Sequence, residues 1–173
     1  LYLEEGRELH KLLTAAKERD LIVSLDMALP DPNSEAGRLD WTAILRRIAP
    51  VVDLFLPSFE EVALMLDRPL FEELVDRAGH EDMLDVVTPE ELSGLGDRLA
   101  GLGIPVAGIK FGHRGFYLRT GGGDRLDGVA ERLGLDPVEW AERELFSQSY
   151  EVADLASATG AGDASIAGFL AAV

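Results

Sequence analysis

The sequence predicts an α/β fold of three layers, α/β/α, built on a mostly parallel central sheet. Two short apolar runs, residues 21–25 and 51–56, have the length and composition of buried parallel strands, and each leads through a loop into a helical pattern. Repeated strand–loop–helix units are typical of parallel sheets covered by helices. Asp26 directly follows the first run, so its carboxylate lies at the sheet edge where open α/β folds bind ligands.

The helical patterns around these strands have recognisable starts. Residues 4–19 carry leucines at helical spacing. Asp40 is the expected N-cap of a helix that runs to about Ile48. A further helix begins at Ser58, and its spacing to Glu61 is that of a capping box.

The middle of the chain continues the alternation. Residues 68–88 are acidic and helical, with an expected apolar face made by Leu70, Phe71, Leu74 and Val75. The run Thr88-Pro89-Glu90-Glu91 starts the next helix, because it offers an N-cap, a proline at the first helical position and an acid at the third. Gly103 is expected to close this helix.

The last third predicts a hairpin and then a variable stretch. Residues 105–119 have the pattern of two strands joined by a tight turn at residues 111–115. Within residues 127–145, Asp136-Pro137 opens an expected helix. Residues 149–152 predict a short strand that leads the chain to a glycine-rich turn.

The composition limits the class of protein and its partners. At 173 residues and 47% hydrophobic content, the chain is long and apolar enough for one globular domain. Its 32 acids against 16 bases give a formal charge of −16, which repels nucleic acids and anionic membranes. The sequence has no cysteine, no bilayer-length apolar run and no signal-peptide pattern. We expect a cytoplasmic protein without nucleic-acid or membrane partners.

The run Ala158-Thr159-Gly160-Ala161-Gly162-Asp163-Ala164 precedes an apolar stretch that is expected to form a buried helix. Its glycines permit a close backbone approach, and the helix start directs N–H groups and the positive end of the dipole at one point. Such a point suits phosphate. Asp163 adds a base that can take a proton from an attacking hydroxyl while the N–H groups hold the charge of a transferred phosphoryl group. A plain helix cap is the alternative interpretation.

The string from Thr159 to Leu170 resembles the C-terminal signature of the ribokinase-like (PfkB-type) carbohydrate kinases. In that family the Gly-Ala-Gly backbone forms the anion hole and the Asp is the catalytic base. Residues 52–61 resemble a family strand that closes in Pro-Asn-x-x-Glu, with Ser58 in place of the Asn. Residues 105–118 contain a turn similar to the family's Thr/Lys-x-Gly-x-x-Gly, for which a plain hairpin is the alternative.

The resemblance implies a ribokinase-like (Rossmann-like) fold and ATP-dependent phosphorylation of a sugar hydroxyl. Asp163 would be the base, and the N–H groups of Gly160, Ala161 and Gly162 would hold the developing charge. The remaining roles would fall to Lys110, Gly112, Gly115 and Thr159 beside the nucleotide, to Asp26 near the substrate or phosphate, and to Glu61, which would help to organise Mg²⁺.

We expect residues 1–173 to be one partial kinase domain, because the chain begins at Leu1 and stops inside an apolar stretch. In the family, a preceding segment carries most sugar contacts and the lid strands of a homodimer, and a following segment completes the adenine pocket. The chain alone is therefore expected to be inactive. Two alternatives stay open: a non-catalytic relative that binds nucleotide or sugar, and a kinase of a nucleoside or another small alcohol.

Overall fold

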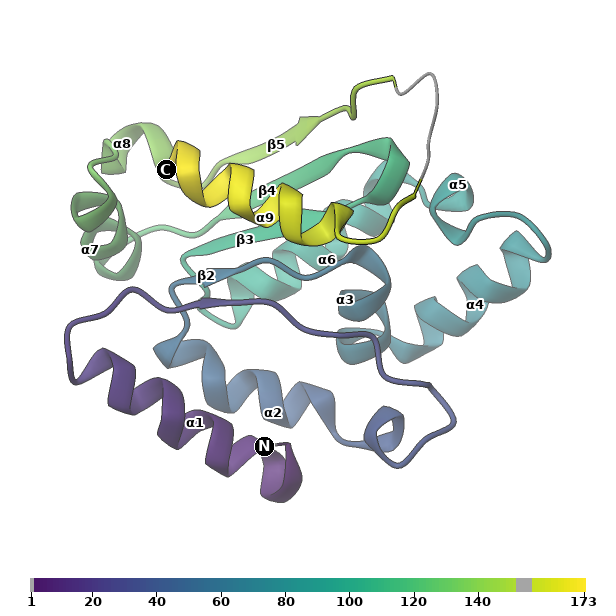
Figure 1. Cartoon of the computed structure of the whole chain (residues 1–173), viewed down its shortest axis with the longest axis horizontal. Coiled ribbons are helices and arrows are strands. Elements are labelled where there is room, and N and C mark those ends of the chain that lie inside the picture. The colour runs from purple at the N-terminus through teal and green to yellow at the C-terminus, as the bar shows by residue number, and fades with distance from the viewer. Residues whose placement is uncertain (1, 152–156) are drawn as a thin grey trace.

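The computed structural model describes residues 2–151 and 157–173, and its centre is a mixed five-stranded sheet (Figure 1). The strands lie across the sheet in sequence order: β1 (Ser24–Leu25), β2 (Leu54–Phe55), β3 (Val106–Lys110), β4 (Phe116–Thr120) and β5 (Glu144–Ser147). β1, β2 and β3 pair in parallel, whereas β4 pairs antiparallel with both β3 and β5. The predicted parallel units and the predicted hairpin are both confirmed.

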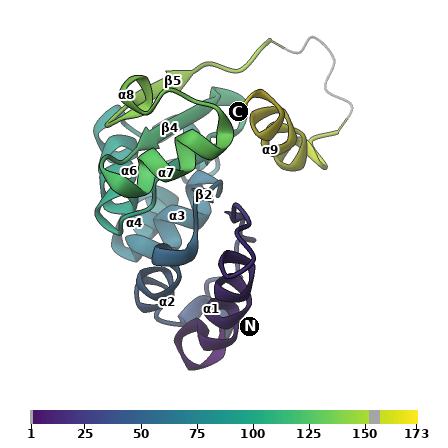
Figure 2. The same cartoon turned by 90° about the vertical axis from the view of Figure 1, so that its left-hand side faces the viewer.

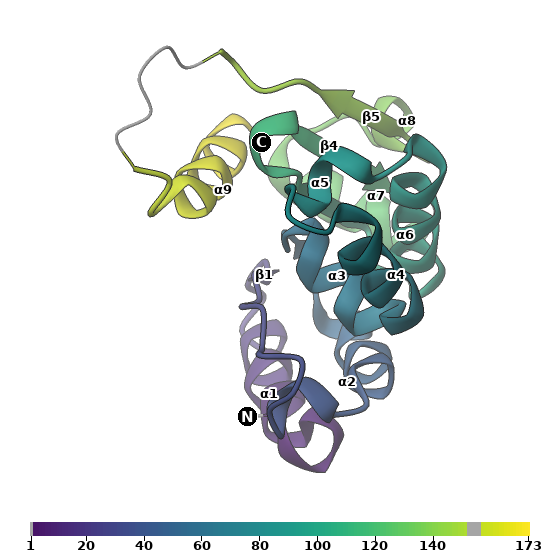
Figure 3. The ribbon, with the colours of Figure 1, turned by 90° about the vertical axis from the view of Figure 1, so that its right-hand side faces the viewer.

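Helices cover both faces of this sheet. They are α1 (Leu3–Lys17), α2 (Trp41–Ile48), α3 (Phe59–Leu66), α4 (Arg68–Ala78), α5 (Met83–Val86), α6 (Pro89–Gly101), α7 (Asp124–Leu133), α8 (Pro137–Trp140) and α9 (Ala161–Ala172). One apolar cluster joins α1 to α6 with Phe55 and Ile109 of the sheet. A second joins α7 and α9 with Leu54 and Val106. Figures 2 and 3 show α6 and α9 on opposite sides of the sheet, so the predicted three-layer α/β/α fold is confirmed.

Side-chain caps set the starts of the central helices. Asp40 accepts a backbone N–H of the first turn of α2, as predicted. α3 and α6 begin with reciprocal capping boxes, Ser58 with Glu61 and Thr88 with Glu91. Each box satisfies backbone donors that a helix start leaves without partners, which is why these sequences begin helices where they do.

A buried ion pair lies at the amino-terminal edge of the parallel strands. Asp53, which is only 3% exposed, accepts two hydrogen bonds from Lys17 Nζ, at 2.8 and 2.6 Å, and one from the N–H of Val23, at 2.8 Å. Arg125 of α7 donates to the adjacent Val52 carbonyl at 2.8 Å. These bonds tie α1, α7 and the starts of β1 and β2 to one point.

Two expectations in the first half of the chain were too simple. The strands β1 and β2 have only two residues each. An apolar run in the sequence indicates burial, but it does not indicate how many of its residues form ladder hydrogen bonds. Residues 68–88 form two helices, since Gly79 (φ 60°) ends α4 and Asp82 caps the separate helix α5. Val75, expected on the apolar face, is 46% exposed.

The helix expected to open at Asp136-Pro137 is confirmed, with Asp136 as its side-chain cap, but it is only one turn long. The structure divides this stretch into the end of α7, the single turn α8 and β5, because Gly134 in the left-handed region ends α7. α7 itself begins at Asp124, directly after Gly123. The expected strand at residues 149–152 does not form over residues 149–151, and Val152 lies outside the described residues. Besides β3, β4 pairs with β5, which comes before residues 149–152 in the chain.

The helix α9 is also not buried as expected, since none of its residues is buried. Leu170 is 41% exposed. Its contact with the sheet runs through Phe169, whose ring stacks on Phe116 of β4 at a centroid distance of 5.5 Å. Over the part of the chain that the structure describes, no helix has the length and apolarity needed to span a membrane.

Candidate functional site

The carboxyl ends of the parallel strands bring Asp26 and Lys110 together. Asp26 follows β1 directly, and Lys110 ends β3 with its N–H donating to the carbonyl of Pro57, just after β2, at 2.8 Å. Lys110 Nζ donates to both carboxylate oxygens of Asp26, at 2.7 and 2.8 Å. The sequence predicted Lys110 beside the nucleotide and Asp26 near the substrate or phosphate, but it did not predict this ion pair. Parallel strands that end at one edge are the signal that could have indicated it.

Glu61 lies beside this pair and is buried within the first turn of α3. Its Oε2 accepts the N–H of Ser58 at 2.7 Å, so the capping-box interpretation is confirmed. Burial raises the pKa of the Glu61 carboxyl above its usual value, while the Ser58 N–H and the charge of Lys110 act in the opposite direction and the charge of Asp26 adds to the rise. Asp26, Glu61 and Lys110 therefore form one electrostatic cluster.

The glycine-rich turn before α9 lies against Lys110. Gly160 adopts a left-handed conformation (φ 81°) and caps α9. A Cβ placed on Gly162 would lie 3.7 Å from Lys110 Nζ, which is ordinary van der Waals contact. Gly162 belongs to the first turn of α9, where the N–H groups have no intrahelical partners. The ammonium group and the start of the helix thus occupy the same small region.

The other predicted members of this turn have defined places. The Ala161 N–H donates to the Ala158 carbonyl at 3.0 Å, so this donor is engaged within the turn. The Thr159 N–H donates to Ser157 Oγ at 3.1 Å. Asp163 lies in the first turn of α9 and is exposed to solvent. The Asp163 carboxylate is therefore accessible to solvent.

The turn between β3 and β4 needs its glycines for structural reasons. Gly115 has φ 130°, and a Cβ there would collide with the backbone carbonyl of Ser147 in β5. Gly112 has φ 51°, and a Cβ there would lie 2.6 Å from Leu84 Cδ1. These contacts explain why both positions are glycine even if no ligand binds, as the plain-hairpin interpretation requires. The role of the turn beside a nucleotide stays a prediction.

Arg114 in the same turn is held by protein groups. Its guanidinium donates to the backbone carbonyls of Leu84 and Val87, at 2.6 and 3.0 Å, and lies over the ring of Phe111. These bonds fix α5 and the residue after it to the hairpin. The partly buried position of Arg114 explains why an isolated turn sequence does not reveal this role.

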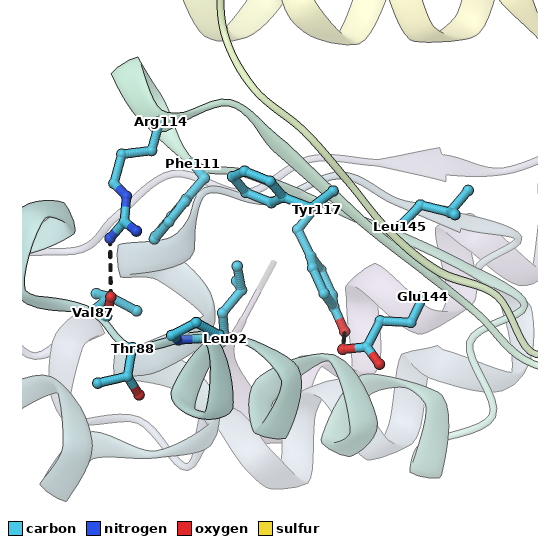
Figure 4. Close-up of a pocket in the computed structure, with 10 residues that line it drawn as sticks. Val87, Thr88, Leu92, Phe111, Arg114, Tyr117, Glu144 and Leu145 are labelled. Atoms are coloured by element: carbon cyan, nitrogen blue, oxygen red, sulfur yellow. Dashed lines mark hydrogen bonds between the residues drawn. The ribbon is translucent and has the colours of Figure 1, made fainter.

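A cavity of about 360 Å³ opens between the start of α6 and the strands β4 and β5 (Figure 4). Its walls are mainly apolar, and they include Leu92, Phe111, Tyr117 and Phe146. Tyr117 donates to Glu144 at 3.0 Å on one side of it. None of the site residues predicted from the sequence lines this cavity. An apolar hollow does not suit phosphate, so the charged cluster at Lys110 is the better candidate for an anion site.

The residues present fit a magnesium–phosphate group better than a protein-only metal centre. Within the described ranges, no three acidic or histidine side chains gather closely enough to hold a metal ion by themselves. Mg²⁺ is commonly bound through one or two carboxylates together with substrate phosphates and water. Asp26 and Glu61 would supply such oxygens, and Lys110 and the first turn of α9 would supply donors for a phosphate group.

Comparison with known proteins returned structural matches alone. No family model and no curated protein matches the chain. Among solved structures, a ribokinase from Thermotoga maritima is 18% identical with a TM-score of 0.46, covering 88% of this chain and 35% of its own. A putative ribokinase II from E. coli in complex with ATP and Mg²⁺ is 21% identical with a TM-score of 0.46, covering 90% and 36%. A PfkB protein from Polaromonas sp. JS666 is 19% identical with a TM-score of 0.42, covering 78% and 44%.

The chain is therefore similar to ribokinase and PfkB structures. It spans 35% to 44% of the length of the matched chains. All identities are below 25% and all TM-scores below 0.5.

Proposed function

We propose that this chain carries the phosphoryl-transfer centre of a kinase that moves a phosphoryl group from ATP to a hydroxyl of a sugar or sugar-like substrate. One observation carries the proposal: Lys110 Nζ lies 3.7 Å from the position that a Cβ would take if Gly162 had one. An ammonium group and a helix start that face the same point form a binding site for phosphate. The strand-end position is where α/β folds bind ligands.

The surrounding residues have separate roles in this proposal. The Gly162 N–H would stabilise the charge that develops on the transferred phosphoryl group, together with its glycine-rich neighbours. Asp163, exposed one residue later, would accept the proton of the attacking hydroxyl. Asp26 and Glu61 would hold Mg²⁺, directly or through water, and the ion when bound would offset the negative charge of the phosphates.

The acidity of the chain makes this local arrangement significant. A formal charge of −16 opposes the approach of ATP, which is itself an anion. Binding therefore requires a small region in which donors outweigh carboxylates. Lys110 and the first turn of α9 supply those donors, and α9 is held near the sheet by the contact between Phe116 and Phe169.

The experiment that tests the proposal measures ATP consumption by the protein in its longest natural form. A panel of sugars, nucleosides and other small alcohols serves as acceptors, and Asp163→Ala and Asp163→Asn are compared with the wild type. We expect an acceptor-dependent rate that falls by at least about a hundredfold in both variants, the scale of a lost general base. Asp124→Ala is the matched control, because Asp124 is an exposed acid in the first turn of α7.

Each outcome discriminates between functions. An acceptor-dependent rate that is lost with Asp163 but kept in Asp124→Ala supports the kinase and identifies its substrate class. ATP binding without turnover for any acceptor favours a non-catalytic relative that binds nucleotide. Equal rates in the wild type and Asp163→Ala would remove Asp163 from the chemistry and leave the turn as a helix cap.

A further inference from the structure

We propose that Asp26 is a specificity-determining residue. In the absence of ligand it pairs with the Lys110 ammonium group, and this pairing limits the anions that bind to Lys110 to polyphosphates. This inference rests on the proposed function, because it concerns the same phosphate region. Asp26 would act as an internal competitor: an anion gains the ammonium group only if it displaces the carboxylate. A singly or doubly charged small anion would not do so, whereas a triphosphate would.

The geometry of the pair is that of a strong competitor. Both oxygens of Asp26 accept from Lys110 Nζ, at 2.7 and 2.8 Å, and charge-assisted bonds of this length are among the stronger hydrogen bonds in proteins. The Lys110 side chain is only 13% exposed. An entering anion therefore finds little free ammonium surface and has to exchange with Asp26.

The pair is nevertheless placed so that it can open. The Asp26 side chain is 32% exposed, whereas the carboxylate of the other buried pair, Asp53 with Lys17, is 4% exposed. Asp26 Oδ1 also accepts the N–H of Met27 at 2.8 Å, so the carboxylate keeps one partner if Lys110 leaves. Lys110 needs only a small movement of its flexible stem to reach an anion at the start of α9, because Nζ lies 3.7 Å from the place that a Cβ on Gly162 would take.

Charge explains the selectivity. An anion at this site is repelled by Asp26 and by the nearby Glu61, and it is attracted by Lys110 and by the N–H groups of the first turn of α9. Inorganic phosphate is smaller and carries less charge than a triphosphate, so it gains less attraction to set against this repulsion. A triphosphate spreads more charge over Lys110 and the helix start at once, so it can offset the repulsion. Removal of the Asp26 charge should lower this barrier for every anion.

The test measures dissociation constants for inorganic phosphate and for tripolyphosphate without metal, at fixed ionic strength, with the complete chain. The variants are Asp26→Asn, Lys110→Met and the double variant. We expect Asp26→Asn to bind inorganic phosphate about tenfold tighter or more, the change that about 1.4 kcal/mol produces. The preference for tripolyphosphate should fall in the same variant, and the gain should disappear in the Lys110→Met background.

Asp97→Asn is the matched control for net charge, since Asp97 is an exposed acid that pairs with Arg119 at 3.0 Å and is not a member of the cluster. It should leave both dissociation constants within about twofold, because exposed charges are largely screened. Circular dichroism confirms that each variant is folded. A gain in Asp26→Asn that persists without Lys110, a weaker binding of phosphate, or no anion binding by any variant would overturn the inference.

These outcomes are separate from those of the proposed function. The kinase proposal fails if no acceptor gives Asp163-dependent turnover, whatever the anion affinities are. The inference fails if the anion affinities do not respond to Asp26 through Lys110, even where turnover is observed.

Discussion

The ring of Phe169 stacks on the ring of Phe116, with centroids 5.5 Å apart and planes inclined by 27°. Phe116 directly follows Gly115 of the β3–β4 turn, and Phe169 belongs to α9. The contact therefore joins the two segments that carry the candidate nucleotide and catalytic residues. The two residues are 53 positions apart in the sequence, so their contact depends on the tertiary fold.

We predict that Phe169→Ala loosens α9 from the sheet. The stacked pair contributes on the order of 1 kcal/mol beyond its buried area, so its loss should speed amide hydrogen exchange in α9 by about fivefold or more. Exchange in α6, on the other face of the sheet, should not change. Leu170→Ala is the control, because Leu170 is 41% exposed on the same helix. Equal protection of α9 in the two variants would show that the stack does not hold the helix.

Two glycines of α6 should respond to alanine with opposite signs. A Cβ on Gly94 meets no atom within 4 Å, so Gly94→Ala should raise the free energy of unfolding by about 0.5–1 kcal/mol through the helix preference of alanine. A Cβ on Gly96 would collide with the Tyr117 ring, 2.6 Å from Cε1, in a buried position. Gly96→Ala should lower the free energy of unfolding by about 1–3 kcal/mol. Urea unfolding of both variants checks the contrast, and effects of the same sign would contradict it.

Gly115→Ala should be among the most damaging single substitutions in the hairpin. The residue has φ 130°, and a Cβ would strike the backbone carbonyl of Ser147, which cannot move without breaking the β4–β5 ladder. We expect a loss of more than about 3 kcal/mol or failure to fold, since backbone strain and overlap add. Gly123→Ala separates these terms, because Gly123 also has positive φ but has open space for a Cβ. Thermal unfolding midpoints of the two variants provide the comparison.

The buried pair of Asp53 and Lys17 is predicted to be essential for stability. Asp53→Ala leaves the Lys17 ammonium and the Val23 N–H without their acceptor, at a position where the Asp53 side chain is 4% exposed and that of Lys17 is 29% exposed. The expected loss is about 3–5 kcal/mol in the free energy of unfolding. Asp97→Ala removes an exposed partner of Arg119 instead and should cost less than about 1 kcal/mol. A loss at Asp53 as small as that at Asp97 would show that the pair contributes little.

Glu91 is expected to make stability depend on pH in the acid range. Burial acts to raise the pKa of its carboxyl, but hydrogen bonds from Arg77 and from the Thr88 N–H outweigh burial, so the pKa lies below its usual value of 4.5. A depressed pKa in the folded state contributes stability that is present above 4.5 and is lost as the pH falls through the folded pKa.

Urea unfolding of the wild type and Glu91→Gln between about pH 3 and 6 checks this sign. The difference in free energy of unfolding should be largest at the upper end and shrink as the pH falls. Glu90→Gln, an exposed neighbour in the same first turn, is the control. A difference that grows toward low pH would contradict the direction of the pKa shift.

The sequence by itself determined the starts of the central helices, the two parallel strand units and the hairpin. The caps at Asp40, Ser58 and Thr88 were predictable because a helix start satisfies its N–H groups with side chains three residues away or less. The parallel strands followed from short apolar runs between helices, and the hairpin followed from a glycine-containing turn. These are short-range relations, and neighbouring residues carry them.

Only the tertiary structure decided which of these elements meet. The ion pair between Asp26 and Lys110 spans 84 residues, and its existence depends on two strands ending at the same edge. The exposure of α9 could not be predicted, since an apolar helix has the same sequence whether or not another element covers it. The bonds from Arg114 to the carbonyls of Leu84 and Val87 likewise join residues that are distant in the sequence. Contacts between distant residues depend on packing, and packing is decided by the whole fold at once.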